Sequence, residues 1–476
     1  MTEFDADVIV VGCGPVGVMA ALRCTQRGLS VIAIDKDTEV YPLPRAIGMD
    51  DEIQQLVARA GLGEELASFS STMGGGEFVN AAGERVVGIE LPEGTVGPLG
   101  FPPMVTFDQP SFERSLRRAA IAAGVDMRLG LEAIAIDNMG DGIYLQLLEG
   151  SEELSLSARW LIGADGAKST IRSLLGIEMI DQGFDQTWLV VDVTLLDPDL
   201  ELPRLARQHC DPARITTLIP GFGTRRRWEF QLQPGESREE MLTEDAIVQL
   251  LSPWGTSAQL QVDRAAVYRF HASVAECFNQ GSVFLAGDAA HQMPPFNGQG
   301  MCSGMRDAEN LAWKLAQVGS GATRSILDTY DAERRPHATA QVVHAVDAGL
   351  LIEAIAHDGE AALESGYGQR PFPNLEHGVV DGDHFAVGRP LWEPADGQGP
   401  TGDGWHLIRC DVADPVPNLW RQLGAQVHDV SADAYPGLAE PGVTVVVRPD
   451  RYVAAVTRDL TATTDLFAPT LEGVSA

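Results

Sequence analysis

The chain has few cysteines, a shortage of basic residues, and no hydrophobic run that could serve as a membrane span. Its six cysteines are scattered, without a C-x-x-C pair or metal-site spacing, which predicts a reducing, cytoplasmic location and no bound metal. The uncharged run Val8–Leu22 is interrupted by three glycines and a proline, so we do not expect it to cross a membrane. The acidic start, Met1–Asp7, lacks the basic character of a signal peptide.

The charge balance excludes several classes of partner. The chain carries 34 Lys and Arg residues against 67 Asp and Glu residues, a formal net charge of -33. Such a field repels nucleic acid and anionic lipid, so we expect neither as a partner. An anionic nucleotide would need local positive groups or helix N-termini. With 45% hydrophobic and 21% charged residues, the composition is that of a globular protein of two or three domains.

A βαβ unit is predicted at the start of the chain. The β-branched run Asp7–Val11 favours a buried strand, Pro15–Arg27 has helical periodicity, and Ser30–Ile34 favours a second strand. Between the first strand and the helix, the glycines follow the pattern G-x-G-x-x-G, with Gly12, Gly14 and Gly17 at its three positions.

This glycine pattern predicts a dinucleotide site. Three glycines allow a tight turn, close approach of the backbone to a pyrophosphate, and close packing of helix on strand. The helix N-terminus adds partial positive charge and free N–H groups. Asp35 ends the second strand, where an acidic side chain takes the ribose hydroxyls.

Three later segments favour FAD over NAD. Ala164–Ser169 holds the acid–glycine turn Asp165–Gly166, the buried strand Ser282–Ala286 runs into Gly287–Asp288, and Pro294–Gly300 leads into a helix. Strand ends so far apart in sequence suit one extended ligand. Asp288 is placed to bind ribitol hydroxyls, and the helix behind Gly298 to direct N–H groups at a flavin edge.

Taken in order, these segments resemble the single-component FAD-dependent aromatic hydroxylases of the p-hydroxybenzoate hydroxylase fold family. The likeness is closer to the 3-(3-hydroxyphenyl)propionate hydroxylase branch and covers about residues 1–345. The segments that carry it are Gly12–Gly17, Pro44–Glu52, Gln109, Asp165–Gly166, Arg227–Phe230, Pro234–Glu236, Gly287–Asp288 and Gly304–Asp307.

The resemblance assigns roles to individual residues. Arg45 and Pro294 are expected to position the flavin, as the nearest to catalytic residues that the sequence offers. Asp35, in place of the commoner glutamate, is expected at the adenosine ribose, Ala133 beside the adenine, and Asp165–Gly166 near both FAD and the passing nicotinamide. The complete set expected to bind FAD is Gly12, Gly14, Gly17, Asp35, Arg45, Gln109, Ala133, Asp165, Gly166, Asp288, Gly298, Gln299, Gly300 and Met301.

The fold that follows is α/β. It has a Rossmann-like FAD-binding domain, an inserted antiparallel-sheet substrate domain, and a small C-terminal thioredoxin-like module. The expected boundaries are 1–180 and 276–350 for the FAD-binding domain, 181–275 for the substrate domain, 351–404 for a linker and 405–476 for the module. Cys410 is the module's lone cysteine, which excludes dithiol chemistry and favours a packing or dimerisation role, so a homodimer stays open.

The activity that the resemblance implies is hydroxylation of a phenolic substrate. NADH or NADPH reduces FAD, the reduced flavin adds O2, and the resulting flavin hydroperoxide attacks an electron-rich ring. Two alternatives stay open: a flavin oxidoreductase acting on a polyketide-like or alkene substrate, and a non-catalytic flavoprotein that sequesters an aromatic ligand. A halogenase is disfavoured because no W-x-W-x-I-P segment occurs.

Several residues have a plain structural interpretation beside the functional one. We expect Asp51 with Gln54 to cap a helix, although Asp50 and Asp51 also suit substrate contact. His291 is expected to be a hydrogen-bonded structural histidine, and Arg225–Arg227 a solvated surface cluster. Cys13 and Cys302 are expected to fill space, while Trp188, Trp228 and Phe296 suit either a pocket or the core.

Overall fold

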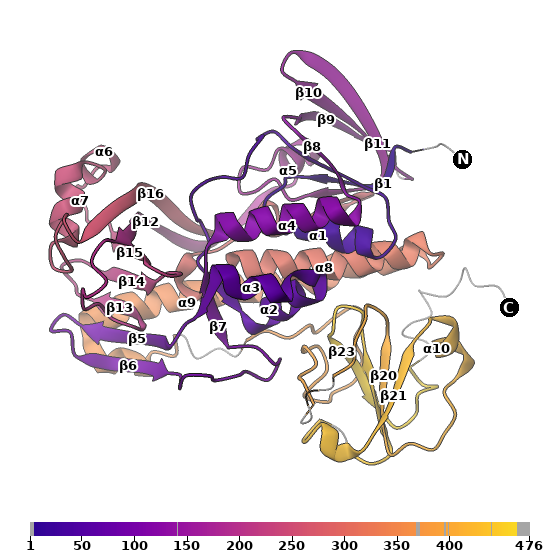
Figure 1. Ribbon diagram of the computed structural model, residues 1–476. Coiled ribbons are helices and arrows are strands. Elements are labelled where there is room, and N and C mark those ends of the chain that lie inside the picture. Colours follow the sequence, from indigo (N-terminus) through magenta and orange to yellow (C-terminus); the bar gives the residue numbers. More distant parts are fainter. Residues whose placement is uncertain are drawn as a thin grey trace.

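The computed structural model describes residues 4–139, 141–367, 372–394, 397, 399–438 and 440–463. Two large sheets and one small module make up the molecule, and long helices join them (Figure 1). The α/β fold class predicted from the sequence is therefore confirmed.

The first large sheet has a parallel centre. Its strands lie in the order β18 (Val283–Leu285), β11 (Glu152–Gly163), β1 (Ala6–Val11), β2 (Val31–Asp35) and β8 (Asp126–Leu129). The antiparallel strands β9 (Glu132–Asn138) and β10 (Ile143–Glu149) continue from β11, and β17 (Asn279–Gln280) pairs with β18. Strand β1 is apolar and almost wholly buried, as a strand covered on both faces must be.

Three helices lie together along this sheet: α1 (Pro15–Gln26), α4 (Gln109–Ala123) and α8 (Gly300–Gly319) (Figure 1). The short α5 (Thr170–Leu175) follows β11. A small sheet of β3 (Gly48–Asp50), β7 (Met104–Phe107) and β4 (Ser70–Thr72) lies nearby, with α2 (Asp51–Val57), η1 (Ala58–Leu62) and α3 (Gly63–Phe69).

The second large sheet is antiparallel except at one pairing. Its strands are, in order, β19 (His291–Gln292), β16 (Leu260–Ala275), β12 (Met179–Leu195), β15 (Arg225–Gln231), β14 (Thr216–Pro220), β13 (Ala206–Cys210), β5 (Gly75–Asn80) and β6 (Arg85–Glu90). One face packs on α6 (Arg238–Met241) and α7 (Glu244–Leu251) through Leu189, Trp228 and Phe230. Trp228 is therefore a core residue.

This sheet extends beyond the range 181–275. Strand β13 pairs in parallel with β5, which brings the hairpin β5–β6 into the same sheet. The pairing joins residues more than a hundred positions apart, so no local pattern in the sequence announces it.

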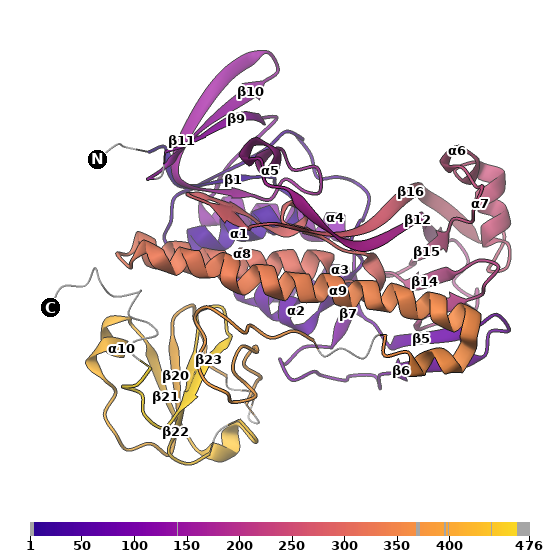
Figure 2. The ribbon, with the colours of Figure 1, turned by 180° about the vertical axis from the view of Figure 1, so that it is seen from behind.

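The long helix α9 (Asp328–Asp358) spans both large sheets, with η4 (Arg324–Leu327) before it and η5 (Gly359–Glu364) after it (Figure 2). The continuous stretch Arg324–Glu364 is long and apolar enough for a membrane span, but half of its most apolar window is buried inside the protein. It packs against α8 and β16, as the core helix of a globular domain does.

The C-terminal module is a four-stranded mixed sheet. Its order is β21 (Gln426–Val430), β20 (His406–Cys410), β22 (Val443–Val447) and β23 (Val453–Thr457), with α10 (Asn418–Gln422) and η6 (Ala432–Ala434). Part of the stretch expected to be a linker packs into it, because Ala386 and Leu391 lie in its core and Asp381 and Pro390 form β-bridges with its last strand region. That part of 351–404 is packed structure.

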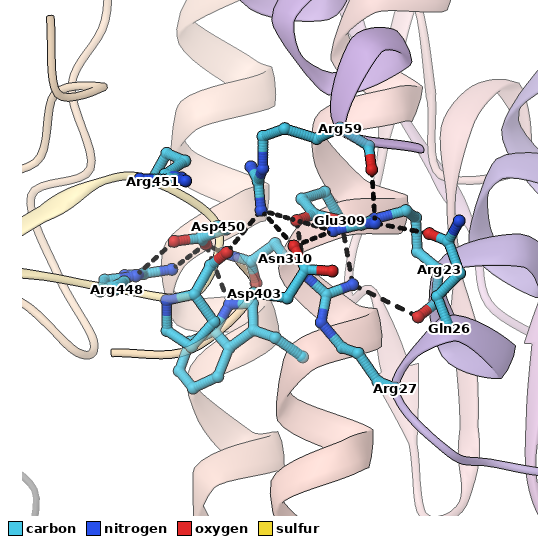
Figure 3. Close-up of polar contacts among 12 residues, drawn as sticks. Arg23, Gln26, Arg27, Arg59, Glu309, Asn310, Asp403, Arg448, Asp450 and Arg451 are labelled. Atoms are coloured by element: carbon cyan, nitrogen blue, oxygen red, sulfur yellow. Dashed lines mark hydrogen bonds and ion pairs between the residues drawn. The ribbon is translucent and has the colours of Figure 1, made fainter. Parts of the chain in front are cut away.

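A cluster of charged side chains joins the module to the helices along the first large sheet (Figure 3). We call Arg23, Arg27, Arg59, Glu309 and Asp403 the arginine cluster. The carboxylate of Glu309 accepts hydrogen bonds from all three arginines, at 2.9 Å from Arg23, 2.6 Å from Arg27 and 3.0 Å from Arg59. Asp403 pairs with Arg23 and Arg59, and Arg59 also reaches the carbonyl oxygen of Pro449.

Candidate active site

The carboxyl ends of the parallel strands bring the predicted turns to one edge of the sheet. Val11 of β1 is level with Ile34 of β2 and Gly163 of β11, and Gly163 is level with Leu285 of β18. The next residues of each strand therefore lie side by side: the glycine turn, Asp35, Asp165–Gly166 and Gly287–Asp288. In open α/β sheets this edge is where ligands bind.

The three glycines of the first turn differ in what surrounds them. A Cβ on Gly12, whose φ is +103°, would lie 2.4 Å from the carbonyl oxygen of Ala164. A Cβ on Gly17 would lie 1.9 Å from the carbonyl oxygen of Gly12. Gly14 has nothing within 4 Å and begins α1 without a side-chain cap. Two glycines thus allow tight packing, and the third leaves open space at a helix N-terminus.

The turn is held by Asp35 and Arg117. The Asp35 carboxylate accepts a hydrogen bond from the backbone N–H of Cys13 at 2.6 Å. Arg117 of α4 donates to the carbonyl oxygen of Cys13 at 2.8 Å, which places a half-buried positive charge beside the turn. Sequence reasoning missed Arg117, although it follows Gln109 and Glu113 at helical spacing on the same face of α4.

Arg45 lies in an extended loop whose backbone is fixed from two sides. The side-chain oxygen of Gln109 accepts from the N–H groups of Arg45 at 2.7 Å and Ala46 at 2.6 Å. Arg227 donates to the carbonyl oxygens of Pro44 and Arg45 at 2.7 Å each. The Arg45 guanidinium itself is exposed, 5.0 Å from the ring centre of Tyr41, so it is free to meet an anion.

The prediction that residues 225–227 form a solvated surface cluster is wrong for Arg227. Its side chain is buried and pairs with Asp192 at 2.7 Å, and Arg264 shares the same carboxylate at 3.3 Å. Alternation along β15 turns Arg227 toward the Pro44–Arg45 loop. Arg225 is exposed, as expected, and pairs with Asp108.

The side chain of Asp165 forms hydrogen bonds within its own turn. Its carboxylate accepts from the hydroxyl of Ser169 at 2.5 Å and from the N–H of Thr170 at 2.7 Å, at the start of α5. Gly166 has φ +80° with open space around it. Ala133 is buried on β9, just after Leu131, whose N–H bonds to the carbonyl oxygen of Asp35.

Asp288 lies in the short turn η2 (Gly287–Ala289) that follows β18, with part of its side chain exposed and most of it surrounded by protein. This partial desolvation raises the pKa of its carboxyl, and the nearby His291 and Arg45 oppose the rise. Arg45 and Asp288 are thus close enough to interact, although 243 positions separate them in the sequence. His291 is buried and bonds to Asp307 at 2.7 Å, which confirms its structural interpretation.

The segment Pro294–Met301 runs from η3 (Pro295–Asn297) into α8. Gly298 has φ +63° with open space beside it, as a turn that approaches a ligand requires. Gln299 is held by Arg306 at 3.0 Å, and Arg306 in turn pairs with Asp50 and Glu52. The N-terminus of α8 is therefore fixed in direction by a buried arginine.

Two smaller expectations are also settled. The helix at 51–57 is capped by Asp50, which accepts from the N–H of Ile53 at 3.0 Å, so the predicted cap at Asp51 was one residue late. Burial raises the pKa of the Cys13 thiol to about 12, as befits a residue that only fills space. Among the described residues, no three His, Cys, Asp or Glu side chains are arranged to hold a metal.

The face of the antiparallel sheet away from α6 and α7 carries aromatic rings next to this loop. The ring centre of Phe296 lies 5.5 Å from Trp188 and 6.3 Å from Phe270, and Tyr268 stacks on Phe270 at 6.3 Å. Trp188 and Phe270 meet at 6.2 Å. Phe270 and Tyr268 stay half-exposed, so this face is an incompletely covered aromatic wall.

Comparison with known proteins places the chain among flavoproteins. Residues 5–345 match a family described as the FAD binding domain. A probable NADH-specific resorcinol 4-hydroxylase of Rhodococcus jostii (strain RHA1) is 32% identical, with 95% of this chain and 92% of that protein covered. A 3-(3-hydroxy-phenyl)propionate/3-hydroxycinnamic acid hydroxylase of Burkholderia cenocepacia (strain HI2424) is 33% identical, with 94% and 93% covered.

Solved structures show the same fold. Aklavinone-11 hydroxylase, crystallised with FAD and aklavinone, superposes with a TM-score of 0.84 at 23% identity and covers 99% of this chain and 100% of its own. At this identity the likeness concerns the fold.

Proposed function

The chain belongs to the FAD binding domain family, and from this premise we propose that it is a monooxygenase that hydroxylates a small phenolic ring, using FAD, O2 and NADH or NADPH. The observation that carries the proposal is the meeting of Gly14, Asp35, Arg45 and Asp288 at one sheet edge that borders an aromatic wall.

The residues present fit FAD. The space beside Gly14 is open, because a Cβ built there meets nothing within 4 Å. The N-terminus of α1 offers backbone N–H groups to a pyrophosphate in that space. Arg45 and Arg117 supply positive charge in a chain of net charge -33. FAD bound there would supply the redox chemistry and the activation of O2.

The protein's own residues then position the cofactor and shield the substrate from water. Gln109 and Arg227 fix the Arg45 loop, and Arg306 fixes Gln299 at the start of α8, so both segments are held in place. Trp188 itself is buried in a core cluster with residues of α9. We propose that the half-exposed rings of Phe270 and Phe296, which pack against it, receive the substrate ring and limit access of water.

We also propose that the four-stranded C-terminal sheet is the thioredoxin-like module of this branch. Its lone Cys410 is buried, and burial raises the pKa of its thiol to about 11. Such a thiol is unreactive, which supports a packing role.

The test uses the purified protein with its FAD. Oxidation of NADH and of NADPH is followed with and without resorcinol and 3-(3-hydroxyphenyl)propionate, together with O2 consumption and product mass. We expect one phenol to stimulate turnover at least tenfold and to gain one oxygen atom. Tight phenol binding without stimulation would instead indicate a sequestering flavoprotein.

A further inference from the structure

Glu229 of β15 is a buried carboxyl without a partner. Its side chain belongs to a residue that is 4% exposed, and the described part of the chain gives it neither a hydrogen bond nor an ion pair. Buried polar groups in folded proteins are almost always paired, because an unpaired one costs free energy. A buried carboxyl left unpaired by its own protein is a candidate to meet a ligand.

Glu229 lies between two residues of β15 that contact other parts of the fold. Alternate residues of a strand share one face, so Arg227, Glu229 and Gln231 point to the same side. Arg227 bonds to the backbone of the Pro44–Arg45 loop. Gln231 bonds to Glu353 of α9 at 3.2 Å. Glu229 lies between these two contacts, on the face that carries the aromatic wall.

Its cross-strand neighbours on that face are small. Glu229 pairs with Val190 of β12, and Val190 pairs with Ala266 of β16. On the next row lie Trp188 and Tyr268. On its other side Glu229 pairs with Thr217 of β14, so its carboxyl lies among small side chains and next to the aromatic row.

The other charged groups on this face are already engaged. Asp192 is shared by Arg227 and Arg264, and Glu353 accepts from Gln186 at 2.6 Å and from Gln231. Burial raises the pKa of the Glu229 carboxyl to about 7; Arg227 lowers it and Asp192 raises it. In the described part of the chain, the titratable or charged groups on this sheet face are Asp192, Arg227, Arg264 and Tyr268, and Glu353 of α9 contacts it through Gln231.

We propose that Glu229 binds the phenolic hydroxyl of the substrate and accepts its proton. The proposal rests on the proposed function. In the step, the phenol O–H bond breaks, the proton moves to a Glu229 carboxylate oxygen, and the electron pair stays on the phenolate oxygen. The proton returns when the product is released. The greater electron density of a phenolate ring favours attack by an electrophilic oxygen.

The first measurement is binding, which needs no turnover. Resorcinol is titrated into the oxidised FAD-loaded protein between pH 6 and 8.5, and the perturbation of flavin absorbance gives its Kd. We expect wild type to bind about tenfold more tightly at pH 8.5 than at pH 6, because a carboxylate accepts the phenol hydrogen bond much more strongly than a neutral carboxyl. Glu229→Gln should bind weakly at every pH, and Glu229→Asp should keep part of the pH dependence.

The second measurement is turnover of the same variants. General-base groups contribute roughly a hundredfold or more, so we expect Glu229→Gln to lose about that factor in hydroxylation while retaining its FAD. Glu239→Gln is the matched control, because Glu239 is an exposed carboxyl of α6 on the opposite side of the sheet. It should behave as wild type.

The outcomes separate the two proposals. If wild type binds resorcinol with the same pH dependence as Glu229→Gln, the role of Glu229 is overturned while the monooxygenase proposal stands. If wild type binds neither resorcinol nor 3-(3-hydroxyphenyl)propionate, the substrate proposal and the role of Glu229 both fall. If Glu229→Gln loses its FAD or its folded spectrum, Glu229→Asp becomes the test. Its resorcinol affinity must then change less with pH than that of wild type, or the proposal is rejected.

Discussion

Two buried polar regions of this molecule handle charge in opposite ways. In the arginine cluster, three guanidinium groups surround Glu309, and although burial alone would raise its pKa, Arg23, Arg27 and Arg59 hold it well below its usual range (Figure 3). On the aromatic face, Glu229 has no such partner among the described residues, and burial raises the pKa of its carboxyl to about 7. The first region is completed by the chain itself, and the second is incomplete without a ligand.

The difference separates structural polar groups from functional ones. The ion pairs of the arginine cluster fix how the module and the FAD-binding half meet, and their removal should weaken folding without affecting the chemistry. An unpaired carboxyl destabilises the folded state and is retained where it meets something else. Each of the following predictions tests one side of this contrast.

The largest effect is expected at Glu309. Replacing it with Ala leaves the buried Arg23 and Arg27 with only the partly exposed Asp403 as a carboxylate partner, and breaking such a buried pair typically costs about 3–5 kcal/mol of unfolding free energy. Urea denaturation at pH 7 measures this cost. The control is Glu440→Ala, which breaks an exposed pair with Arg458 and should change stability little. Equal stability of the two variants would show that the arginine cluster is not what fixes the interface.

The stability contribution of Glu229 should depend on pH with a sign opposite to that of a paired carboxylate such as Glu309. Its carboxyl has an ordinary pKa of 4.5 and a folded pKa of about 7, so the folded protein holds the proton more tightly than the unfolded chain. The associated stability is therefore present below pH 4.5 and is lost as pH rises through 7. At about 1.4 kcal/mol per pKa unit the loss is about 3 kcal/mol.

Comparison with Glu229→Gln isolates this contribution, because all other groups titrate in both proteins. The unfolding free energy of wild type relative to Glu229→Gln should fall between pH 5 and pH 8. A constant difference across that range would mean that Glu229 is not a buried neutral carboxyl.

Asp403 should give a smaller effect with the reverse pH dependence. Burial raises the pKa of its carboxyl, but Arg27 and Arg23 outweigh burial and lower it. Its stabilisation is therefore present above the ordinary carboxyl pKa and is lost as pH falls. Because about a third of its side chain is exposed, we expect Asp403→Asn to cost only about 1 kcal/mol at pH 7, and nothing in strong acid. Urea denaturation midpoints of wild type and Asp403→Asn at pH 7 and pH 3 measure this cost. An equal cost at both pH values would contradict the prediction.

The sequence revealed more of the cofactor edge than of the sheet that faces it. The G-x-G-x-x-G turn, Asp35 and Gly287–Asp288 each follow a local strand pattern, and parallel pairing brings them together. Whether Arg227 points inward depends on which face of β15 is covered, and that is decided by distant segments. Glu229 was visible within its motif, but its lack of a partner is a property of the folded neighbourhood.

The smallest stability effect, with a large functional one, is expected at Gly14. Its φ of -75° is open to any residue, and a Cβ there meets nothing within 4 Å, so Gly14→Ala should shift the unfolding free energy of the FAD-free protein by less than about 1 kcal/mol. The added methyl would occupy the space that a pyrophosphate needs, so FAD affinity should fall tenfold or more, as fluorescence titration would show. Gly17→Ala is the contrasting variant, because its Cβ would lie 1.9 Å from a backbone oxygen and must disturb the fold itself. If Gly14→Ala kept full FAD affinity, the open space at the start of α1 would not be the pyrophosphate site, and the ligand that completes the candidate site would have to bind elsewhere.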